Sequence, residues 1–327
     1  RNMMFRRGRR LRDTVIIRDL VRENELSVKD FILPIFVVEG ENIKREISSL
    51  KGNYHWSVDR LGELVKELKE TAVRSVIIFG VPEHKDCKGT EAYNEDGIVQ
   101  KAIRKLRELD DELYIITDVC MCEYTDHGHC GILHGKSIDN DETLEYLGKI
   151  ALSHAKAGAH MIAPSDMMDG RIGHIRKVLD DNGFKMTPIM SYAAKYASGF
   201  YGPFREAAGS APQFGDRKGY QMDPANSREA MLEIEADINE GADIIMVKPA
   251  MSYLDIVREA RNRYDVPLCV YNVSGEYAMV KSAGEAGLID EKRVALEMLM
   301  SMKRAGAKMI MTYYALEAAR WLKEDNN

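Results

Sequence analysis

The chain has 327 residues, of which 45% are hydrophobic and 30% are charged, and its formal net charge is −6. This composition is that of a soluble globular protein with a large core, and its acidic balance argues against binding to nucleic acid or to an anionic membrane surface. No apolar stretch approaches the roughly 20 residues that a membrane-spanning helix needs, so a membrane protein is not expected.

The cysteines indicate the compartment in which the protein works. There are 5 of them, an odd number, and three lie close together between residues 120 and 130. Such a pattern argues against a disulfide framework and is typical of a reducing environment. We therefore expect a cytoplasmic protein.

The first segment, residues 1–28, differs from the remainder of the chain. It opens with the basic stretch RNMMFRRGRRLR and has no apolar period. A transit-peptide remnant would be richer in serine, and an arm that binds nucleic acid fits poorly with an acidic chain. A frayed, solvated terminus is the simplest alternative. We expect an arm that packs on a neighbouring subunit, followed by one catalytic domain over residues 29–327.

Eight short apolar runs follow the arm. They cover residues 31–37, 75–80, 113–119, 160–165, 187–192, 243–249, 267–273 and 309–314. Each is hydrophobic almost throughout, as strands buried on both faces are, and most intervals hold a helical pattern. This alternation predicts a (β/α)8 barrel. Three junctions share a phrase, AGAHMI, GADIIM and AGAKMI, whose glycine suits a helix C-cap.

Chemistry in such barrels lies at the C-terminal ends of the strands. The third run contains Asp118 and leads into Cys120, Cys122 and Cys130. Thiolates at this density are good zinc ligands, and three protein ligands leave one position open, which is typical of catalytic zinc. A structural zinc is the alternative. Its fourth ligand would be a nearby histidine or a more distant cysteine, namely His127, His129 or Cys87.

Two lysines belong to neighbouring runs. Lys195 follows the fifth run by a few residues, and Lys248 closes an apolar stretch in the sixth. Burying an ammonium group is costly without a purpose, although either lysine could simply be a solvated strand end. Two like charges held close and partly desolvated favour the neutral amine, which forms Schiff bases with ketones. The pair therefore predicts carbonyl chemistry.

Further polar residues point to a carboxylate on the substrate. Ser274 follows the seventh run and Tyr313 lies in the eighth, and both hydroxyl groups can donate hydrogen bonds. Arg205 and Arg217 flank a glycine-bearing segment that we expect to be a mobile lid, and arginine binds carboxylates with two hydrogen bonds. Each residue could be structural by itself, but together they indicate a small ketone with a carboxylate.

Seven stretches make the chain resemble the 5-aminolaevulinate dehydratase (porphobilinogen synthase) family from about residue 5 to the end. They are DVCMCEYTDHGHCG, IAPSDMMDGRI, MSYAAKYASGFYGPFR, DRKGYQMDPAN, MVKPA, VSGEYAM and RAGAKMIMTYYA. The resemblance implies a TIM barrel lyase of porphyrin and heme biosynthesis. It would condense two molecules of 5-aminolaevulinate to porphobilinogen with loss of two waters. It would assemble as a homo-octamer through the N-terminal arm.

The resemblance also implies roles for individual residues. Lys248 and Lys195 would form Schiff bases with the P-side and the A-side substrate, respectively. The P-side carboxylate would bind Ser274 and Tyr313, and the A-side carboxylate would bind Arg205, Arg217 and Gln221. Asp118 is a candidate for moving a proton or for placing a substrate amine, and a hydrogen bond to the adjoining loop is its alternative.

Two metals are implied as well. Zn²⁺ would bind Cys120, Cys122 and Cys130. The stretch DPANSREAMLE resembles magnesium-activated members, so an allosteric Mg²⁺ would bind Glu233, for which a solvated acidic helix face is the alternative. Glu123 departs from the proline expected after the second cysteine, and we assign it no role.

Two other functions compete with this prediction. A Schiff-base aldolase on the same barrel needs one reactive lysine and no zinc thiolates, so borohydride trapping at two lysines would exclude it. A non-catalytic zinc protein could use the basic arm to bind nucleic acid, but the net charge of −6 argues against it.

Overall fold

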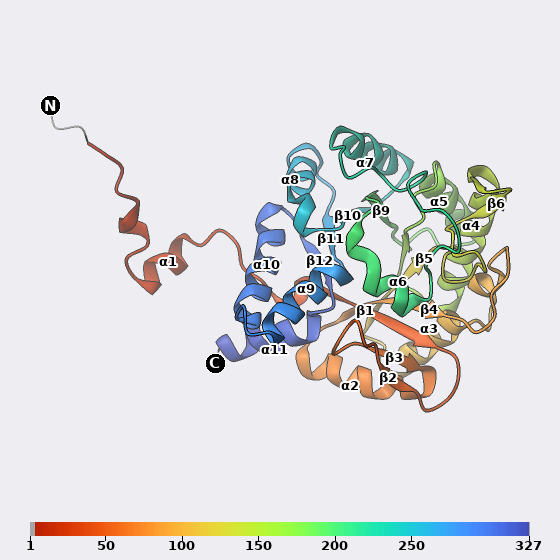
Figure 1. The fold of residues 1–327 in the computed structure, drawn as a ribbon, viewed down its shortest axis with the longest axis horizontal. Helices are drawn as coiled ribbons and strands as arrows, with labels where there is room; N and C mark the ends of the chain where they lie inside the picture. Colours follow the sequence, from red (N-terminus) through yellow and green to blue (C-terminus); the bar gives the residue numbers. More distant parts are fainter. Residues whose placement is uncertain (1–3, 327) are drawn as a thin grey trace.

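Eight parallel strands form the centre of the fold in the computed structural model, which describes residues 4–326. The strands are β1 (Phe31–Val38), β4 (Ser75–Val81), β5 (Tyr114–Val119), β8 (Met161–Pro164), β9 (Met190–Lys195), β10 (Ile244–Lys248), β11 (Leu268–Asn272) and β12 (Met309–Thr312). They neighbour one another in the order β8-β5-β4-β1-β12-β11-β10-β9. A bridge between Ile162 and Ile189 joins the first and last of these strands, so the sheet closes and the predicted (β/α)8 barrel is confirmed (Figure 1).

A helix connects each strand to the next and covers the outside of the barrel. These helices are α2 (Leu61–Thr71), α3 (Ile98–Leu109), α4 (Asn140–Ala157), α5 (Arg171–Asp181), α7 (Arg228–Glu240), α8 (Leu254–Arg263) and α10 (Glu291–Ala305), and α11 (Ala315–Asp325) follows the last strand. Helix α2 buries an apolar face against the core through Leu61, Leu64, Val65 and Leu68. Burial of one apolar stripe per helix is what attaches the outer layer to the barrel.

The repeated junction phrase marks three helix ends, as predicted. Gly158, Gly241 and Gly306 follow α4, α7 and α10 with φ angles of 114°, 112° and 129°. This left-handed conformation costs other residues energy because their Cβ crowds the backbone, which explains the glycine. The alanine after each glycine is buried beside the next strand: Ala159, Ala242 and Ala307.

The remaining elements enlarge one end of the barrel. In the loops that follow strands lie β2 (Lys44–Glu46), β3 (Tyr54–Ser57), β6 (Ile132–His134), β7 (Ser137–Asp139), α6 (Gly202–Ala208) and α9 (Ser274–Glu285). The short 3-10 helices are η1 (Gly8–Leu11), η2 (Val28–Asp30), η3 (Val58–Arg60), η4 (Thr90–Tyr93), η5 (Gly199–Tyr201) and η6 (Met251–Tyr253). η1 and η2 precede β1 and lie outside these loops. The loops that follow strands leave the C-terminal strand ends, so they build walls around the mouth where barrel enzymes place their sites.

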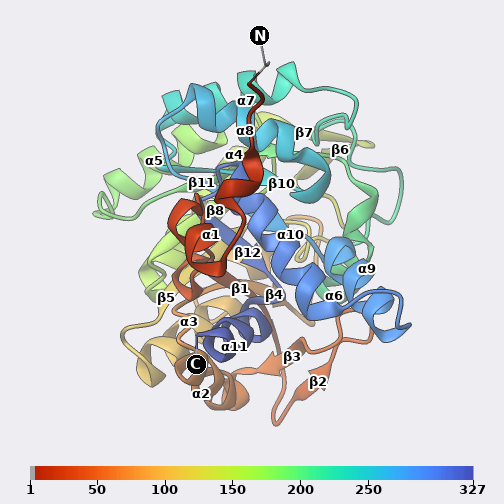
Figure 2. The same ribbon diagram turned by 90° about the vertical axis from the view of Figure 1, so that its left-hand side faces the viewer.

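The N-terminal segment stands off the barrel. It contains η1 and α1 (Val15–Val21), and Figure 1 shows it extending away on the side of α10 and α11. Figure 2, viewed from that side, shows α1 in front of the barrel. Its apolar side chains are exposed, with Phe5 at 70%, Ile16 at 74% and Leu20 at 75% of their surface. Residues 1–3 of the expected arm lie outside the described residues, and the boundary at residue 28 stays a prediction.

Within residues 4–326, no helix combines the length and the apolar character needed to cross a membrane.

Candidate active site

Lys195 and Lys248 are the last residues of β9 and β10, and they lie directly opposite each other in the register of that strand pair. The expectation that Lys195 follows its strand by a few residues is wrong. The register shifts by one residue between Ile245 and Val247, so β9 carries one more residue than β10 over this stretch. Without that shift Lys248 would oppose Ala194, and the two lysines would point to opposite faces of the sheet.

Aromatic rings surround the ammonium group of Lys248. Its Nζ lies 5.5 Å from the ring centre of Tyr192, 4.7 Å from Tyr201, 5.0 Å from Phe204 and 4.7 Å from Tyr271. The side chain is buried. Burial lowers the pKa of Lys248 well below its ordinary value, and the neighbouring charge of Lys195 lowers it further. The end of β10 therefore holds an amine, that of Lys248, which loses its proton readily.

Lys195 is held by the loop after β8. Its Nζ donates a hydrogen bond of 2.6 Å to the carbonyl oxygen of Ser165, and the ring of Tyr192 lies 5.5 Å away. Asp118 faces both lysines from the end of β5. Burial raises the pKa of Asp118 to about 6, while the Ser165 hydroxyl and the two lysines oppose that rise. One carboxylate oxygen of Asp118 has no hydrogen-bond partner.

The three predicted zinc ligands come together. The sulfur atoms of Cys120, Cys122 and Cys130 all lie within 4.8 Å of one another, and all three residues are buried. The separation between Cys120 Sγ and Cys122 Sγ is 3.6 Å. Hydrogen bonds from these two thiols hold the pKa of Cys130 well below its ordinary value, and the positive charge of Arg217 lowers it further. The pKa values of Cys120 and Cys122 are raised well above their ordinary value by the neighbouring cysteines and by burial, so Cys130 is the member of the cluster that is disposed to be a thiolate in the metal-free protein.

None of the alternative fourth ligands lies with the three sulfur atoms, although the buried Nε2 of His127 has no hydrogen-bond partner. His129 contacts the hydroxyl of Tyr220 at 3.0 Å and the carbonyl oxygen of Phe214 at 2.9 Å through its two ring nitrogens. His127 Nδ1 accepts a hydrogen bond from the backbone of His129 at 3.0 Å. Cys87 is exposed. Among the described residues, no histidine or carboxylate joins the three cysteines as a fourth donor. This arrangement favours the open, catalytic kind of site over the structural one.

Of the predicted A-side carboxylate ligands, Arg217 and Gln221 line the cavity beside the lysines, and Arg205 lies close enough to Arg217 to interact with its charge. Arg217 is buried and donates hydrogen bonds from Nη2 to the carbonyl oxygens of Gly128, at 2.9 Å, and Ser210. Arg205 is half-buried, and burial lowers the pKa of its guanidinium, with Arg217 adding to the effect. Both polar atoms of the buried Gln221 side chain lack a partner. Two cations and an unpaired amide can together bind an anion that offers several oxygens.

The two predicted P-side ligands lie at the ends of neighbouring strands, Ser274 after β11 and Tyr313 after β12. Ser274 is the first residue of α9, and its Oγ accepts a hydrogen bond of 3.0 Å from the backbone of Phe204. Tyr313 follows β12, and its hydroxyl contacts that of Tyr271 at 2.8 Å. Both hydroxyl groups are therefore oriented by neighbours at the barrel mouth. Ser274 and Tyr313 both lie just after their strands, although the eighth apolar run of the sequence includes Tyr313.

The space between the two lysines is almost closed. The cavity that Asp118, Lys195, Gln221 and Lys248 share has a volume of about 10 Å³. The segment with η5 and α6 covers it, placing Phe204 against Lys248. Glu123, to which we assigned no role, lines this cavity too, and burial raises its pKa to about 8. The segment with η5 and α6 lies in the stretch expected to form a lid, and its opening stays a prediction.

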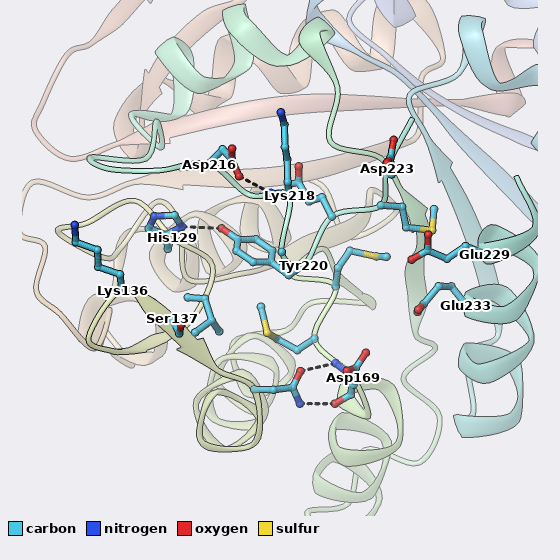
Figure 3. A pocket seen from close by; sticks show the side chains of 17 residues that line it. His129, Lys136, Ser137, Asp169, Asp216, Lys218, Tyr220, Asp223, Glu229 and Glu233 are labelled. Atoms are coloured by element: carbon cyan, nitrogen blue, oxygen red, sulfur yellow. Dashed lines mark hydrogen bonds between the residues drawn. The ribbon is translucent and has the colours of Figure 1, made fainter. Parts of the chain in front are cut away.

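Glu233 lies in a larger cavity beside the barrel mouth. This cavity has a volume of about 590 Å³, and Figure 3 shows Glu229 and Glu233 projecting into it from α7, with Asp169 on another wall. Burial raises the pKa of Glu233, and the charge of Asp237 raises it further. Asp237 itself is buried, so the acidic face expected for this helix is smaller than its sequence indicated.

The helix that carries Glu233 begins at Arg228 and has no side-chain cap. Asn226 and Glu229 have the spacing of a capping box, but no capping box is formed. The Asn226 amide instead donates a hydrogen bond of 3.2 Å to the Glu229 carboxylate. The Asn226 side chain therefore accepts no hydrogen bond from the backbone N–H groups in the first turn of α7.

Sequence reasoning missed the residues that surround the lysines. The rings around Lys248 come from β9, η5, α6 and β11, and the first and last of them, Tyr192 and Tyr271, are 79 positions apart in the chain. The only sequence feature that indicated these rings was a tyrosine near the end of each of two apolar runs, Tyr192 in one and Tyr271 in the other. It also missed the Ser165 carbonyl, because any residue type can supply a backbone oxygen.

Comparison with known proteins gives a consistent result over the whole chain. The family profile described as Delta-aminolevulinic acid dehydratase matches residues 5–321. The protein of that name from Bacillus subtilis (strain 168) is 55% identical over 320 residues, which cover 98% of this chain and 99% of the relative. The one from Staphylococcus aureus (strain Mu50) is 53% identical over 322 residues, covering 98% and 99%.

Solved structures agree. The delta-aminolevulinic acid dehydratase (porphobilinogen synthase) of Toxoplasma gondii ME49, in complex with the reaction product porphobilinogen, superimposes with a TM-score of 0.96 at 43% identity. The alignment covers 98% of this chain and 93% of that one. A dihydropteroate synthase from Coxiella burnetii, at a TM-score of 0.51 and 11% identity, shares the barrel fold alone.

Proposed function

The chain belongs to the delta-aminolevulinic acid dehydratase family, and from that premise we propose that Lys195 and Lys248 form the two Schiff bases of its reaction. The enzyme is a hydro-lyase of tetrapyrrole biosynthesis that condenses two molecules of 5-aminolaevulinate into porphobilinogen with loss of two waters. The observation that carries the assignment is the direct pairing of two buried lysines across β9 and β10.

Lys248 supplies the more readily deprotonated amine, because burial and the charge of Lys195 both disfavour its ammonium form. A neutral amine adds to the ketone of one substrate, and a water leaves as the imine forms. The second substrate reacts with Lys195 in the same way. Loss of a proton next to one imine gives an enamine, whose carbon attacks the imine carbon of the other substrate and leaves that lysine bonded as an amine. Elimination of this amine together with a neighbouring proton releases the first lysine and leaves a C=C double bond. Attack of a substrate amine on the remaining imine closes the ring, and loss of the second lysine and of a ring proton gives the pyrrole.

The two substrates are held by different partners. On one side, Ser274 and Tyr313 donate to a carboxylate near Lys248. On the other, Arg205, Arg217 and the unpaired amide of Gln221 bind a carboxylate near Lys195. Holding two copies of one molecule in different poses contributes proximity, which is the main advantage an enzyme offers a condensation.

The three cysteines fit Zn²⁺. Tetrahedral zinc with Zn–S bonds of about 2.3 Å requires sulfur atoms about 3.8 Å apart. The sulfur atoms of Cys120, Cys122 and Cys130 lie within 4.8 Å of one another, and the pKa of Cys130 is lowered towards the thiolate form. Bound zinc supplies a Lewis acid for a substrate oxygen. Asp118, with one unpaired carboxylate oxygen, moves a proton or places a substrate amine beside the lysines.

Mg²⁺ binds at Glu233 in this proposal. The half-buried Glu233 shares the 590 Å³ cavity with Asp169, Asp223 and Glu229, so the cavity offers oxygen donors and room for water. A hard cation that keeps most of its waters needs one direct carboxylate and such a polar surrounding. Because α7 also supports β9, a cation here acts on the active site from a distance, as an allosteric activator.

We place the enzyme in the cytoplasm as a homo-octamer assembled through the arm. The apolar side chains of Phe5, Val15, Ile16 and Leu20 are exposed in the single chain, and a neighbouring copy would cover them.

One experiment tests the lysine assignment. The protein is incubated with 5-aminolaevulinate, part of the sample is assayed for pyrrole by colour, and part is reduced with borohydride and mapped by peptide mass. We expect pyrrole formation and a reduced adduct at both Lys195 and Lys248. An adduct at Lys248 alone, with pyrrole still formed, contradicts the two-lysine assignment, and absence of pyrrole contradicts the function.

A further inference from the structure

Arg171, the first residue of α5, holds three elements together inside the protein. Its side chain is 2% exposed. Nη1 donates to both carboxylate oxygens of Asp237 on α7, each at 3.1 Å. Nη2 donates to Ser191 Oγ and to the Tyr192 carbonyl oxygen on β9, also at 3.1 Å each. A single guanidinium with several donors in one plane is suited to joining a helix and a strand in this way.

The same guanidinium reaches the loop that supports Lys195. Arg171 Nε lies 3.7 Å from an Asp166 carboxylate oxygen, and Asp166 is fully buried. The residue before Asp166 is Ser165, whose carbonyl oxygen accepts the 2.6 Å hydrogen bond from Lys195 Nζ. The residue after it, Met167, has a φ angle of 65°, a conformation that a residue with a Cβ rarely adopts. A strained loop of this kind persists only where its surroundings hold it.

Lys195 is therefore tied to Arg171 from both ends. Its backbone belongs to the strand that Arg171 binds at Tyr192, three residues earlier, and the acceptor of its ammonium group belongs to the loop that Arg171 faces at Asp166. A buried guanidinium thus sets the position of the strand relative to the loop. The separation between the Lys195 backbone and the Ser165 carbonyl decides where Nζ points.

Lys248 has a different support. Its ammonium group lies among the rings of Tyr201, Phe204 and Tyr271, which belong to η5, α6 and β11. Among the described residues, Arg171 makes no hydrogen bond or ion pair with any of these three. The Tyr192 ring is shared by both lysines, but Arg171 binds the Tyr192 backbone oxygen and not its ring.

We propose that Arg171 is a positioning residue for Lys195, and that it affects the reactivity of Lys195 more strongly than that of Lys248, which meets β9 only through the pairing of the two strands and the shared Tyr192 ring. The proposal rests on the Schiff-base roles proposed above. It predicts that a change at Arg171 affects the two lysines unequally, whereas a residue that only stabilises the fold would affect both alike.

The test compares labelling of the two lysines in Arg171→Lys. Lysine keeps the positive charge opposite Asp237 but cannot reach Asp237, Ser191 and the Tyr192 carbonyl together. The parent and the variant are reduced with borohydride at short times with 5-aminolaevulinate, and adducts at Lys195 and Lys248 are quantified by peptide mass. We expect the Lys195-to-Lys248 ratio to fall about tenfold or more, since a misplacement of about 1 Å costs up to about a hundredfold in rate.

Arg176→Lys is the matched control. Arg176 also lies on α5, but it binds the carbonyl oxygens of Phe184 and Thr187 before β9 begins, far from Lys195 along the strand. Its replacement should leave the ratio unchanged. An unchanged ratio in Arg171→Lys, or an equal fall at both lysines, overturns the proposal.

A milder variant covers the case in which Arg171→Lys does not fold. Ser191→Ala removes one hydroxyl between Arg171 and Asp237 and leaves the charges in place. Its ratio should fall in the same direction by a smaller factor, and an unchanged ratio in a folded Ser191→Ala overturns the proposal. Failure of the proposed function is distinct from these outcomes, because the parent itself would then show no adduct at Lys195.

Discussion

At the scale of single residues, Lys248 combines a reactive group with a cost to stability. Burial lowers its pKa well below the ordinary value, so the folded protein binds the proton less tightly than the unfolded chain does. Between the folded and the unfolded pKa the unfolded chain carries more protons, and stability therefore rises with pH across this window. Below the folded pKa the full penalty is present. An active-site group that destabilises its own fold is a familiar compromise between activity and stability.

Lys248→Met should therefore abolish turnover and stabilise the protein. Methionine keeps the apolar stem among the rings and removes the nucleophile, so kcat should fall by at least about a thousandfold. Stability at pH 7 should rise on the order of 1 kcal/mol, and this gain should shrink as the pH approaches about 10.4, the ordinary lysine pKa. Thermal unfolding at several pH values measures the gain. Lys66→Met on the exposed face of α2 is the control and should show no such pH-dependent gain.

Cys122→Ala should remove zinc without unfolding the barrel. The cysteines lie beyond the end of β5 and belong to the buried core cluster, but most of that cluster is formed by the strands and helices of the barrel. Zinc content, measured by atomic absorption, should fall below one ion per site, and turnover should fall about a hundredfold or more, while far-UV circular dichroism stays unchanged. Cys269→Ala is the control, because Cys269 is buried within β11 away from the cluster. Loss of helical signal when zinc is removed would show a structural metal instead.

At the scale of elements, α9 packs closely against the lid segment, which contains η5 and α6. A Cβ added to Gly275 would lie 2.5 Å from the carbonyl oxygen of Phe200 and 2.8 Å from its Cα, and these are backbone atoms that cannot rotate away. The first turn of α9 therefore meets η5 through a glycine. Ser274 lies beside it, and Phe204, which contacts Lys248, lies on the helix that follows η5.

Gly275→Ala should consequently displace the lid segment and lower kcat/KM about tenfold or more, because substrate-positioning groups move with it. Gly62→Ala is the matched control: its added Cβ meets nothing within 4 Å on helix α2. It should leave activity intact and raise stability by about 0.5–1 kcal/mol through helix propensity. Steady-state kinetics and thermal unfolding measure both. Parent-like kinetics in Gly275→Ala would show that the lid tolerates the shift.

Helix α7 carries the second element-scale prediction. Millimolar Mg²⁺ should raise activity in the parent, and Glu233→Gln should lose this response while its zinc content stays unchanged, because glutamine removes the charge that a hard cation requires. Glu235→Gln is the control, since Glu235 is exposed on the same helix and outside the cavity wall. If Glu233→Gln responds to magnesium as the parent does, the cation binds elsewhere.

At the scale of the whole molecule, the N-terminal arm is the segment whose apolar side chains the single chain leaves uncovered. Its apolar side chains are exposed, and Figures 1 and 2 show it standing away from the barrel. A short helix of seven residues such as α1 is marginal in water by its own hydrogen bonds, which supports the proposal that a neighbouring copy covers the arm.

Deletion of residues 1–12 should therefore weaken assembly more than it affects the barrel mouth. The deletion removes the basic stretch that attracts an acidic body at long range. Light scattering over a range of concentrations should show a smaller mean mass than for the parent, while borohydride labelling of Lys248 continues. An unchanged mass at every concentration would exclude this role for the arm.

The sequence by itself determined the barrel and most of the candidate site residues. Eight apolar runs with helical intervals leave little choice of fold, because strands covered on both faces must be hydrophobic throughout. Glycine at three helix ends and cysteines at close spacing are local features, and local features can be read from the chain. The resemblance to a family supplied the roles of residues such as Gln221, whose type alone indicates no chemistry.

Only the tertiary structure decided how the lysines meet. A one-residue shift between β9 and β10 pairs Lys195 with Lys248, and no local pattern reports the register of two strands that lie about fifty residues apart. The rings around Lys248 and the guanidinium of Arg171 come from separate elements, so their contacts exist only after the barrel closes. Periodicity records which residues are buried, whereas packing decides which buried residues touch, and the chemistry of this site depends on the second.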